Sequence, residues 1–198
     1  MVKNIVFDFG QVLVSFNPDY MCSKYIDDPE DIRLVSDVLF DRCYWEKLDA
    51  GTISDEEVIL GACSRLPERL HGKVAQIYDN WVYNIPEIEG MRDCIALARR
   101  KGYGVYLLSN ISLKFVSIYK SISILDGFDG YVFSSVAGCV KPSYEIFDHL
   151  CKKFDLRASE TLFIDDNEKN IAGASAYGII PYHFDGNAQA LYSYIEKL

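Results

Sequence analysis

Five short apolar segments are the feature that most restricts the fold of this chain. Continuous apolar runs of this length are typical of strands that are buried on both faces of a parallel sheet. Helical patterns precede or separate the last four of them, over Met91–Arg100, Ser143–Phe154 (with Pro142 expected in its first turn) and Asn170–Tyr177. Strands that alternate with helices predict an α/β fold, a doubly wound, Rossmann-like parallel sheet. The five expected strands are Lys3–Phe9, Gly104–Ser109, Tyr131–Ser134, Thr161–Asp165 and Ile179–Phe184.

The interval between the first two strands breaks this alternation. It contains no convincing strand but several helical patterns, and the clearest opens with the capping-box sequence Ser54-Asp55-Glu56-Glu57. Further helices are expected over Asp31–Phe40 and Arg69–Trp81. The stretch reads either as extra helical packing on a single domain or as a mobile cap above the sheet.

We favour the cap, because Asn17-Pro18 and Ile85-Pro86 supply plausible hinges on either side. The predicted domains are therefore a Rossmann-like core made of residues 1–16 and 86–198, and a helical cap made of residues 17–85. An inserted cap of this kind would cover whatever site lies at the strand ends.

Composition narrows the classes of partner. The net charge of −9, with no compensating basic patch, argues against nucleic acid and against an anionic membrane surface. No run of eighteen apolar residues predicts a membrane span, and the N-terminal segment does not resemble a signal peptide. The six cysteines are scattered without metal-binding spacing, which is typical of reduced thiols in a cytoplasmic protein.

Polar residues stand at the carboxyl end of each of several predicted strands, where parallel sheets bind ligands. Three carboxylates in one crevice would repel each other unless positive charge lies between them, and Mg²⁺ together with one lysine would neutralise them. Lysine and serine would then hold phosphoryl oxygens while one aspartate attacks phosphorus and forms an aspartyl-phosphate. Taken singly, each signal is weak, because an aspartate at a strand end is usually a helix cap or loop residue, Asp-Asp-Asn can cap a helix and Lys-Pro is a common helix start. The residues concerned are Asp8, Ser109, Asn110, Lys141, Asp165 and Asp166.

At this point the chain resembles the haloacid dehalogenase superfamily of phosphatases. The resemblance rests on four motifs in order, namely FDFGQVLV (Phe7–Val14), LLSN (Leu107–Asn110), VKP (Val140–Pro142) and FIDDNEKN (Phe163–Asn170). The first motif is most similar to a branch of sugar-phosphate phosphatases that act on glucose 1-phosphate, in which DLGNV is usual and Gln11 is replaced by Asn.

The resemblance implies a role for each matching position. Asp8 corresponds to the nucleophile and a metal ligand, and the carbonyl of Gly10 to a backbone metal ligand. Asp166 corresponds to a direct metal ligand, and Asp165 to either a ligand or a residue that orients one. Asn170 falls where many relatives carry an orienting aspartate.

Substrate contacts follow from the same resemblance. Ser109 and Asn110 correspond to the phosphate-binding pair, and Lys141 to the charge-balancing lysine of the catalytic site. Gly10 and Gln11 are expected beside the phosphate. The implied substrate is a small phosphorylated molecule, acted on by a monomer or a homodimer.

Gly10 is the departure from the family pattern. Most phosphatases of the family carry an aspartate there, which protonates the leaving oxygen and later deprotonates water, help that is worth about 10²–10⁴ in rate. A sugar leaving from its anomeric phosphate needs less protonation than an ordinary alcohol. Gly10 therefore favours an aldose 1-phosphate, or a residue of the cap that takes over the proton transfer.

The stretch from Trp45 to Ser54 lies where cap loops of this family face the site. Trp45 is expected to stack on a sugar, and Glu46 or Asp49 to bind its hydroxyl groups. The alternative is that Trp45 belongs to the cap interior and that both acids are solvated.

Four other functions stay open from the sequence. A C–halogen hydrolase needs no metal, which leaves Asp165 and Asp166 unexplained, and a phosphonate-cleaving relative would need a cap lysine, for which Lys24 and Lys47 are the candidates. A receiver domain would be shorter and would lack the helical insertion. A pseudophosphatase that binds phosphate or a partner without turnover is the non-enzymatic alternative.

Overall fold

The computed structural model describes all 198 residues and contains one five-stranded parallel sheet. The strand order is β3-β2-β1-β4-β5, so the first strand lies at the centre. Phe7 at the end of β1 lies opposite Leu107 of β2 and Ile164 of β4, which brings three strand ends to one edge. The predicted fold class is confirmed. The strands are β1 (Asn4–Phe7), β2 (Gly104–Ser109), β3 (Gly130–Phe133), β4 (Thr161–Asp165) and β5 (Ile180–His183).

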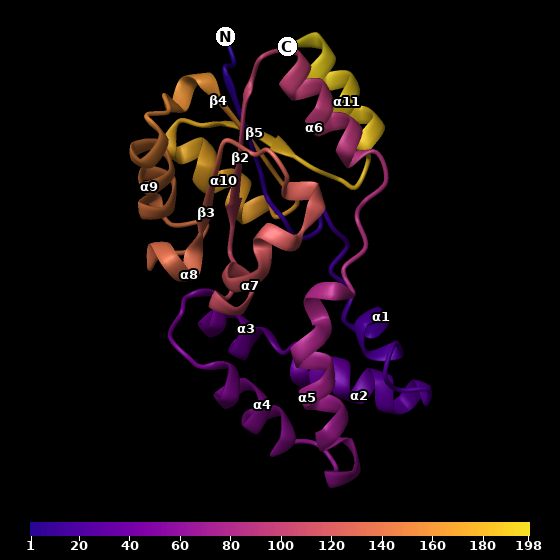
Figure 1. The fold of residues 1–198 in the computed structure, drawn as a ribbon. Coiled ribbons are helices and arrows are strands. Elements are labelled where there is room, and N and C mark those ends of the chain that lie inside the picture. The colour runs from indigo at the N-terminus through magenta and orange to yellow at the C-terminus, as the bar shows by residue number, and fades with distance from the viewer.

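Helices cover both faces of the sheet (Figure 1). Alternate residues of a strand point to opposite faces, so Ile5 and Phe7 pack in one apolar cluster and Val6 in another. The first cluster includes residues of α6 (Met91–Arg100), α7 (Leu113–Ile118) and α11 (Ala188–Lys197). The second includes residues of α9 (Tyr144–Phe154) and α10 (Glu168–Tyr177).

The chain between β1 and α6 is helical, as predicted, and lies at one end of the molecule (Figure 1). Thirteen buried side chains there, from Cys22 to Tyr78, form an apolar cluster of their own. This separate cluster supports a cap, and the division at residues 17 and 85 stays a proposal. The helices are α1 (Pro18–Ser23), α2 (Pro29–Leu39), α3 (Arg42–Asp49), α4 (Asp55–Cys63) and α5 (His71–Asn80).

The two connections between the helical segment and the sheet lie side by side. The N–H of Ser15 donates to the carbonyl of Pro86 at 2.8 Å, and the N–H of Ile88 donates to that of Leu13 at 3.0 Å. Asn17 caps α1, whose first residue is Pro18. The predicted hinge at Asn17-Pro18 therefore follows a short paired segment, and the hinge at Ile85-Pro86 includes one of the paired residues.

Several element boundaries differ from the sequence prediction. Pro142 lies outside α9, because Ser143 occupies the N-cap position. The stretch expected as a cap loop from Trp45 is helical as far as Asp49, and Ser134 begins the short helix α8 (Ser134–Ala137) instead of ending a strand. The capping box at Ser54 is confirmed, with reciprocal bonds to Glu57 of 2.8 and 3.2 Å.

No helix combines the length and the apolar character that crossing a membrane requires. All six cysteines are unpaired.

Candidate active site

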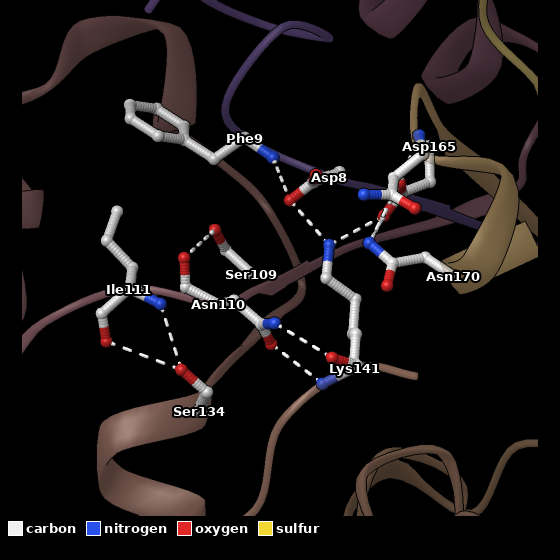
Figure 2. A network of polar contacts seen from close by, with 10 residues as sticks. Asp8, Phe9, Ser109, Asn110, Ile111, Ser134, Lys141, Asp165 and Asn170 are labelled. Carbon is white, nitrogen blue, oxygen red and sulfur yellow. Dashed lines mark hydrogen bonds and ion pairs between the residues drawn. The ribbon is translucent and has the colours of Figure 1, made fainter. Parts of the chain in front are cut away.

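The carboxyl ends of β1, β2 and β4 bring the predicted polar residues together (Figure 2). Asp8 follows β1, Ser109 ends β2, and Asp165 ends β4. Asp8, Asp165 and Asp166 each offer a carboxylate oxygen, and these oxygens lie within 4.8 Å of one another. Adjacent parallel strands in register thus place three acids at a single point.

Lys141 is the cation at the centre of this group. Its side chain is 1% exposed, and its Nζ lies 2.7 Å from Asp8 Oδ1 and 2.6 Å from Asp165 Oδ2. Burial disfavours the charged amine, but the two carboxylates outweigh it and raise the pKa of Lys141 above its usual value. The lysine is therefore held as a cation between two acids.

Asp165 is saturated with protein donors. Its Oδ1 accepts from the N–H of Asn167 at 2.8 Å and from Asn170 Nδ2 at 3.0 Å. Its Oδ2 accepts from Lys141 at 2.6 Å and from Asn170 at 3.1 Å. The carboxylate is completely buried, and its hydrogen bonds orient Lys141 and the start of α10.

Asp8 and Asp166 keep oxygens without protein partners. Asp8 Oδ1 accepts from the N–H of Phe9 at 2.7 Å and pairs with Lys141, whereas no donor reaches Oδ2. Burial raises the pKa of Asp8 to about 7, with Lys141 opposing the shift and Asp165 adding to it. Burial also raises the pKa of the half-buried Asp166, and Asp165 adds to that shift. The cluster is short of positive charge.

The donor set fits a divalent cation that prefers oxygen. Three carboxylates and one lysine leave two negative charges uncompensated, which is the charge of one Mg²⁺ ion. The carbonyl oxygen of Gly10 accepts no hydrogen bond and borders the same cavity. Asp8, Asp166 and this carbonyl are the groups with free oxygen atoms.

Ser109 and Asn110 differ in their availability. The side chain of Asn110 is engaged by the backbone of Lys141, from whose N–H it accepts at 2.8 Å and to whose carbonyl it donates at 3.0 Å. The Ser109 hydroxyl makes only a 3.5 Å contact with the carbonyl of Asn110. The backbone N–H groups of Gly10 and Asn110 have no acceptor in the protein. One hydroxyl and two amides are thus free to bind an anion.

These groups line two neighbouring hollows, a polar cavity and an apolar recess. A polar cavity of about 490 Å³ is bordered by Asp8, Lys141 and Asp166 together with residues of α3. An adjoining recess of about 270 Å³ is largely apolar. They share Gly10, Arg42, Trp45, Asp49, Ser109 and Asn110, so a ligand in one continues into the other.

Trp45 belongs to the wall of this recess. Its Nε1 donates to the carbonyl of Leu39 at 2.8 Å, and its ring stacks on Phe40 at 5.1 Å. Phe16 and Trp81 meet it edge-on at 5.3 and 5.2 Å. Trp45 is thus both part of the packed aromatic cluster and a lining residue.

Gln11 lies apart from the polar cavity. It has a positive φ of 57° and borders only the apolar recess. Its Oε1 accepts from the N–H of Phe16 at 3.1 Å, which stabilises the turn after Asp8. In the structure this side chain supports the turn, and a contact with phosphate stays a prediction.

Sequence reasoning missed Arg42 and Ser134. Arg42 borders both hollows, and its separation from Trp45, Glu46 and Asp49 places all four on one face of α3. That spacing was a usable signal, but the stretch was expected to be a loop. Ser134 belongs to no sequence motif, and only its hydrogen bonds in the structure identify it.

Known proteins resemble the chain over most of its length. A family model described as haloacid dehalogenase-like hydrolase matches residues 2–178. A D-ribitol-5-phosphate phosphatase of Bacteroides thetaiotaomicron is 33% identical over 186 residues, covering 86% of each protein. A sesquiterpene phosphatase of Aspergillus oryzae is 26% identical over 184 residues, covering 91% of this chain and 89% of the relative.

Solved structures share the fold. A HAD family enzyme of Bacteroides thetaiotaomicron, in complex with magnesium and inorganic phosphate, matches with a TM-score of 0.71 at 20% identity, over 94% of this chain and 96% of that one. An L-2-haloacid dehalogenase of Xanthobacter autotrophicus matches with a TM-score of 0.67 at 16% identity, over 92% and 77%. The resemblance read from the four motifs is confirmed for the family, and the glucose 1-phosphate branch stays a prediction. The chain belongs to the haloacid dehalogenase-like hydrolases.

Proposed function

We propose that this protein is a Mg²⁺-dependent phosphatase that hydrolyses a small phosphorylated molecule through an aspartyl-phosphate on Asp8. The observation that carries the proposal is the convergence of three carboxylates around one buried lysine at the strand ends. The three carboxylates carry more negative charge than the lysine neutralises, so the cluster suits a metal cation. The cation in turn binds the phosphate group of a substrate. The two phosphatases among the relatives support the same chemistry.

The atoms without protein partners support a role for each group. Asp8 Oδ2, which has no protein partner, attacks phosphorus, while Lys141 and Phe9 hold Oδ1. The Ser109 hydroxyl and the amides of Gly10 and Asn110 bind phosphoryl oxygens.

Asp166, the Gly10 carbonyl and Oδ1 of Asp8 would hold Mg²⁺, which leaves Asp8 Oδ2 for phosphorus, and Asp165 would orient Lys141. When bound, the ion supplies the positive charge that brings a phosphate dianion against the carboxylates. The Mg²⁺ and phosphate complex of the structural neighbour supports this choice of ion.

A sugar phosphate is the first substrate class to test. The recess beside the phosphate groups presents an aromatic wall, and a sugar or polyol would lay its apolar face on Trp45. Gly10 favours an aldose 1-phosphate, whose leaving oxygen needs little protonation, and the ribitol-phosphate relative supports polyol phosphates.

The apolar lining favours a second class. Seven of the thirteen residues that border the recess are hydrophobic, which also suits an isoprenoid chain, and one relative is a sesquiterpene phosphatase. The test panel therefore holds glucose 1-phosphate, glucose 6-phosphate, D-ribitol 5-phosphate and farnesyl phosphate.

The test is release of inorganic phosphate with Mg²⁺ from this panel, with Asp8→Asn as the blank. We expect a preference within the panel and a fall of about 10⁴–10⁶ in kcat for the blank. Trapping of one phosphate per wild-type chain would support the covalent intermediate.

An Asp8→Asn variant that retained turnover would contradict the role of Asp8. Binding of Mg²⁺ and phosphate without release from any ester would instead support the pseudophosphatase.

A further inference from the structure

Position 10 leaves open space beside the nucleophile. A Cβ atom at Gly10 would have no heavy atom within 4 Å, and the residue borders both hollows. A side chain would fit here, and none is present. A side chain that protonates an ester oxygen must therefore come from another element.

The helix that faces this space is α3. Its residues Arg42, Trp45, Glu46 and Asp49 all border the polar cavity that contains Asp8 and Lys141. Of these four, only Arg42, Trp45 and Asp49 also border the apolar recess into which the leaving group of a bound ester would extend. Asp49 is thus the one acid common to both hollows.

A hydrogen-bonded chain fixes the end of α3 to the strand ends. Ser134 Oγ donates to the carbonyl of Asp49 at 2.6 Å and accepts from the N–H of Ile111 at 2.9 Å. Ile111 directly follows the phosphate-side residue Asn110, and Figure 2 shows its contact with Ser134. The backbone of Asp49, from which the carboxylate extends, is therefore held by the core as well as by its own helix.

The chain that follows α3 also lies close to α8 of the core, at Gly51. A Cβ atom at this residue would lie 3.2 Å from the carbonyl oxygen of Ser135, and its φ is +69°. Glycine suits both the conformation and the proximity of the chain to α8.

The Asp49 carboxylate is free to exchange a proton. It is partly buried and forms no hydrogen bond or ion pair, in contrast to the saturated Asp165. Burial raises the pKa of Asp49 to about 7, with Lys141 opposing the shift and Glu46 adding to it. A value near neutrality suits a group that must give and then take a proton. Glu46, by comparison, is exposed and lies 3.8 Å from Arg42.

We infer that Asp49 is the general acid and base of the reaction, supplying from α3 the proton transfer for which Gly10 has no side chain. This inference rests on the proposed function and adds a catalytic residue to it.

In the first step, Asp8 Oδ2 forms a bond to phosphorus and the bond from phosphorus to the ester oxygen breaks. That oxygen keeps the electron pair and takes the proton of the Asp49 carboxyl. In the second step, the Asp49 carboxylate takes a proton from water as the water oxygen bonds to phosphorus. The bond from phosphorus to Asp8 breaks, which regenerates the free carboxylate and releases phosphate.

The test compares Asp49→Asn with the wild type on two esters, an alkyl phosphate and 4-nitrophenyl phosphate. The nitrophenolate can leave without being protonated, whereas the alkoxide of the alkyl ester needs a proton as it leaves. We expect kcat for the alkyl ester to fall by about 10²–10⁴. With the aryl ester we expect a rapid burst of one nitrophenolate per chain, followed by slow turnover and accumulated phosphoenzyme, because water is no longer deprotonated.

Two controls locate the effect. Glu56→Gln makes the same change of charge on an exposed cap residue outside both hollows, and its kinetics should match the wild type. The double variant Gly10→Asp with Asp49→Asn places a carboxyl in the open space at position 10. Its kcat for the alkyl ester should be at least about tenfold higher than that of Asp49→Asn. A double variant as slow as Asp49→Asn would overturn the proton-transfer role.

The remaining outcomes separate two failures. An active wild type with an unchanged Asp49→Asn, or with both esters slowed equally and no burst, would overturn only the role of Asp49. The same burst in Glu46→Gln with a normal Asp49→Asn would assign the role to Glu46. A wild type that released no phosphate from any ester would remove both this inference and the proposed function.

Discussion

Two acids on opposite sides of the candidate site are held in opposite ways: Asp49 borders the polar cavity, whereas Asp165 is buried behind Lys141, which borders it. Asp165, at the end of β4, is completely buried and accepts four hydrogen bonds. Asp49, at the end of α3, is partly buried and its carboxylate has no partner. Saturation fixes a charge and its geometry, whereas an unpartnered carboxyl can change protonation state without breaking a network. The sheet side thus holds charge, and the helical side is left free to move protons.

Removing the central cation should produce the largest effect on the sheet side. Lys141→Met leaves Asp8 and Asp165 buried without their shared partner, and we expect the free energy of unfolding to fall by about 3–5 kcal/mol. Urea denaturation at pH 7.5 measures it. Lys152→Met is the matched control, because Lys152 is 77% exposed and pairs with Asp148 at the surface, so its loss should leave the free energy of unfolding nearly unchanged. Equal losses in the two variants would show that the buried pair does not hold the cluster together.

Asn110→Ala tests whether the Asn110 side chain holds the backbone of Lys141 or binds phosphate. The substitution leaves the N–H and the carbonyl of Lys141 without their partners, and we expect a loss of about 2–3 kcal/mol in the free energy of unfolding. Phosphate affinity, measured by calorimetry with Mg²⁺, should change little. Unchanged stability with much weaker phosphate binding would contradict this assignment and return Asn110 to the role predicted from the motif.

On the helical side, Asp49→Asn should stabilise the protein above neutral pH. The pKa of Asp49 is about 7 in the folded state and about 3.9 in an unfolded chain. Between these values the folded state binds more protons, so stability falls as the pH rises through this window. We expect the variant to be more stable than the wild type by about 1–2 kcal/mol at pH 8, and equally stable near pH 4.

Urea denaturation without metal or substrate measures this difference at each pH. Lys141, Glu46, Arg42, Asp8 and Asp166 border the same cavity and are present in both proteins, so the comparison isolates Asp49. A difference that is the same at pH 4 and pH 8 would show that Asp49 does not titrate in this range.

The sheet side was predictable from the sequence because its signals are local. Asp8 and Asp165 stand at the ends of apolar runs and Lys141 in the segment after another, and parallel strands in register must bring their ends together. Asp8, Lys141, Asp165 and Asp166 were therefore expected at one place, and the structure brings them within reach of one another. The resemblance implied only that Asn170 takes the place of an orienting aspartate, and its hydrogen bonds to Asp165 are found in the structure.

The helical side was less predictable because its contacts are not local. The hydroxyl of Ser134 contacts a residue 85 positions away, and no pattern of polar and apolar residues indicates such a contact. The aromatic wall joins Phe16, Phe40, Trp45 and Trp81 from separate segments, whose apolar character alone is equally consistent with an ordinary interior. Pro142 was placed inside a helix because Lys-Pro is a common helix start, yet the adjacent Ser143 takes the N-cap position.

The smallest effect tests whether the two sides unfold together. Ser54→Ala removes the capping box of α4, and we expect a loss of about 1 kcal/mol. Hydrogen exchange read residue by residue distinguishes two results. If the helical segment is a separate unit around its own apolar cluster, amides of α4 and α5 will exchange faster while those of β1 and β4 keep their rates. Ser64→Ala, at the other end of α4, removes only a local bond to the Gly61 carbonyl and should leave both regions unchanged. Faster exchange throughout the sheet in Ser54→Ala would show one cooperative unit, and the proposed boundary between residues 17–85 and the core would then have no energetic meaning.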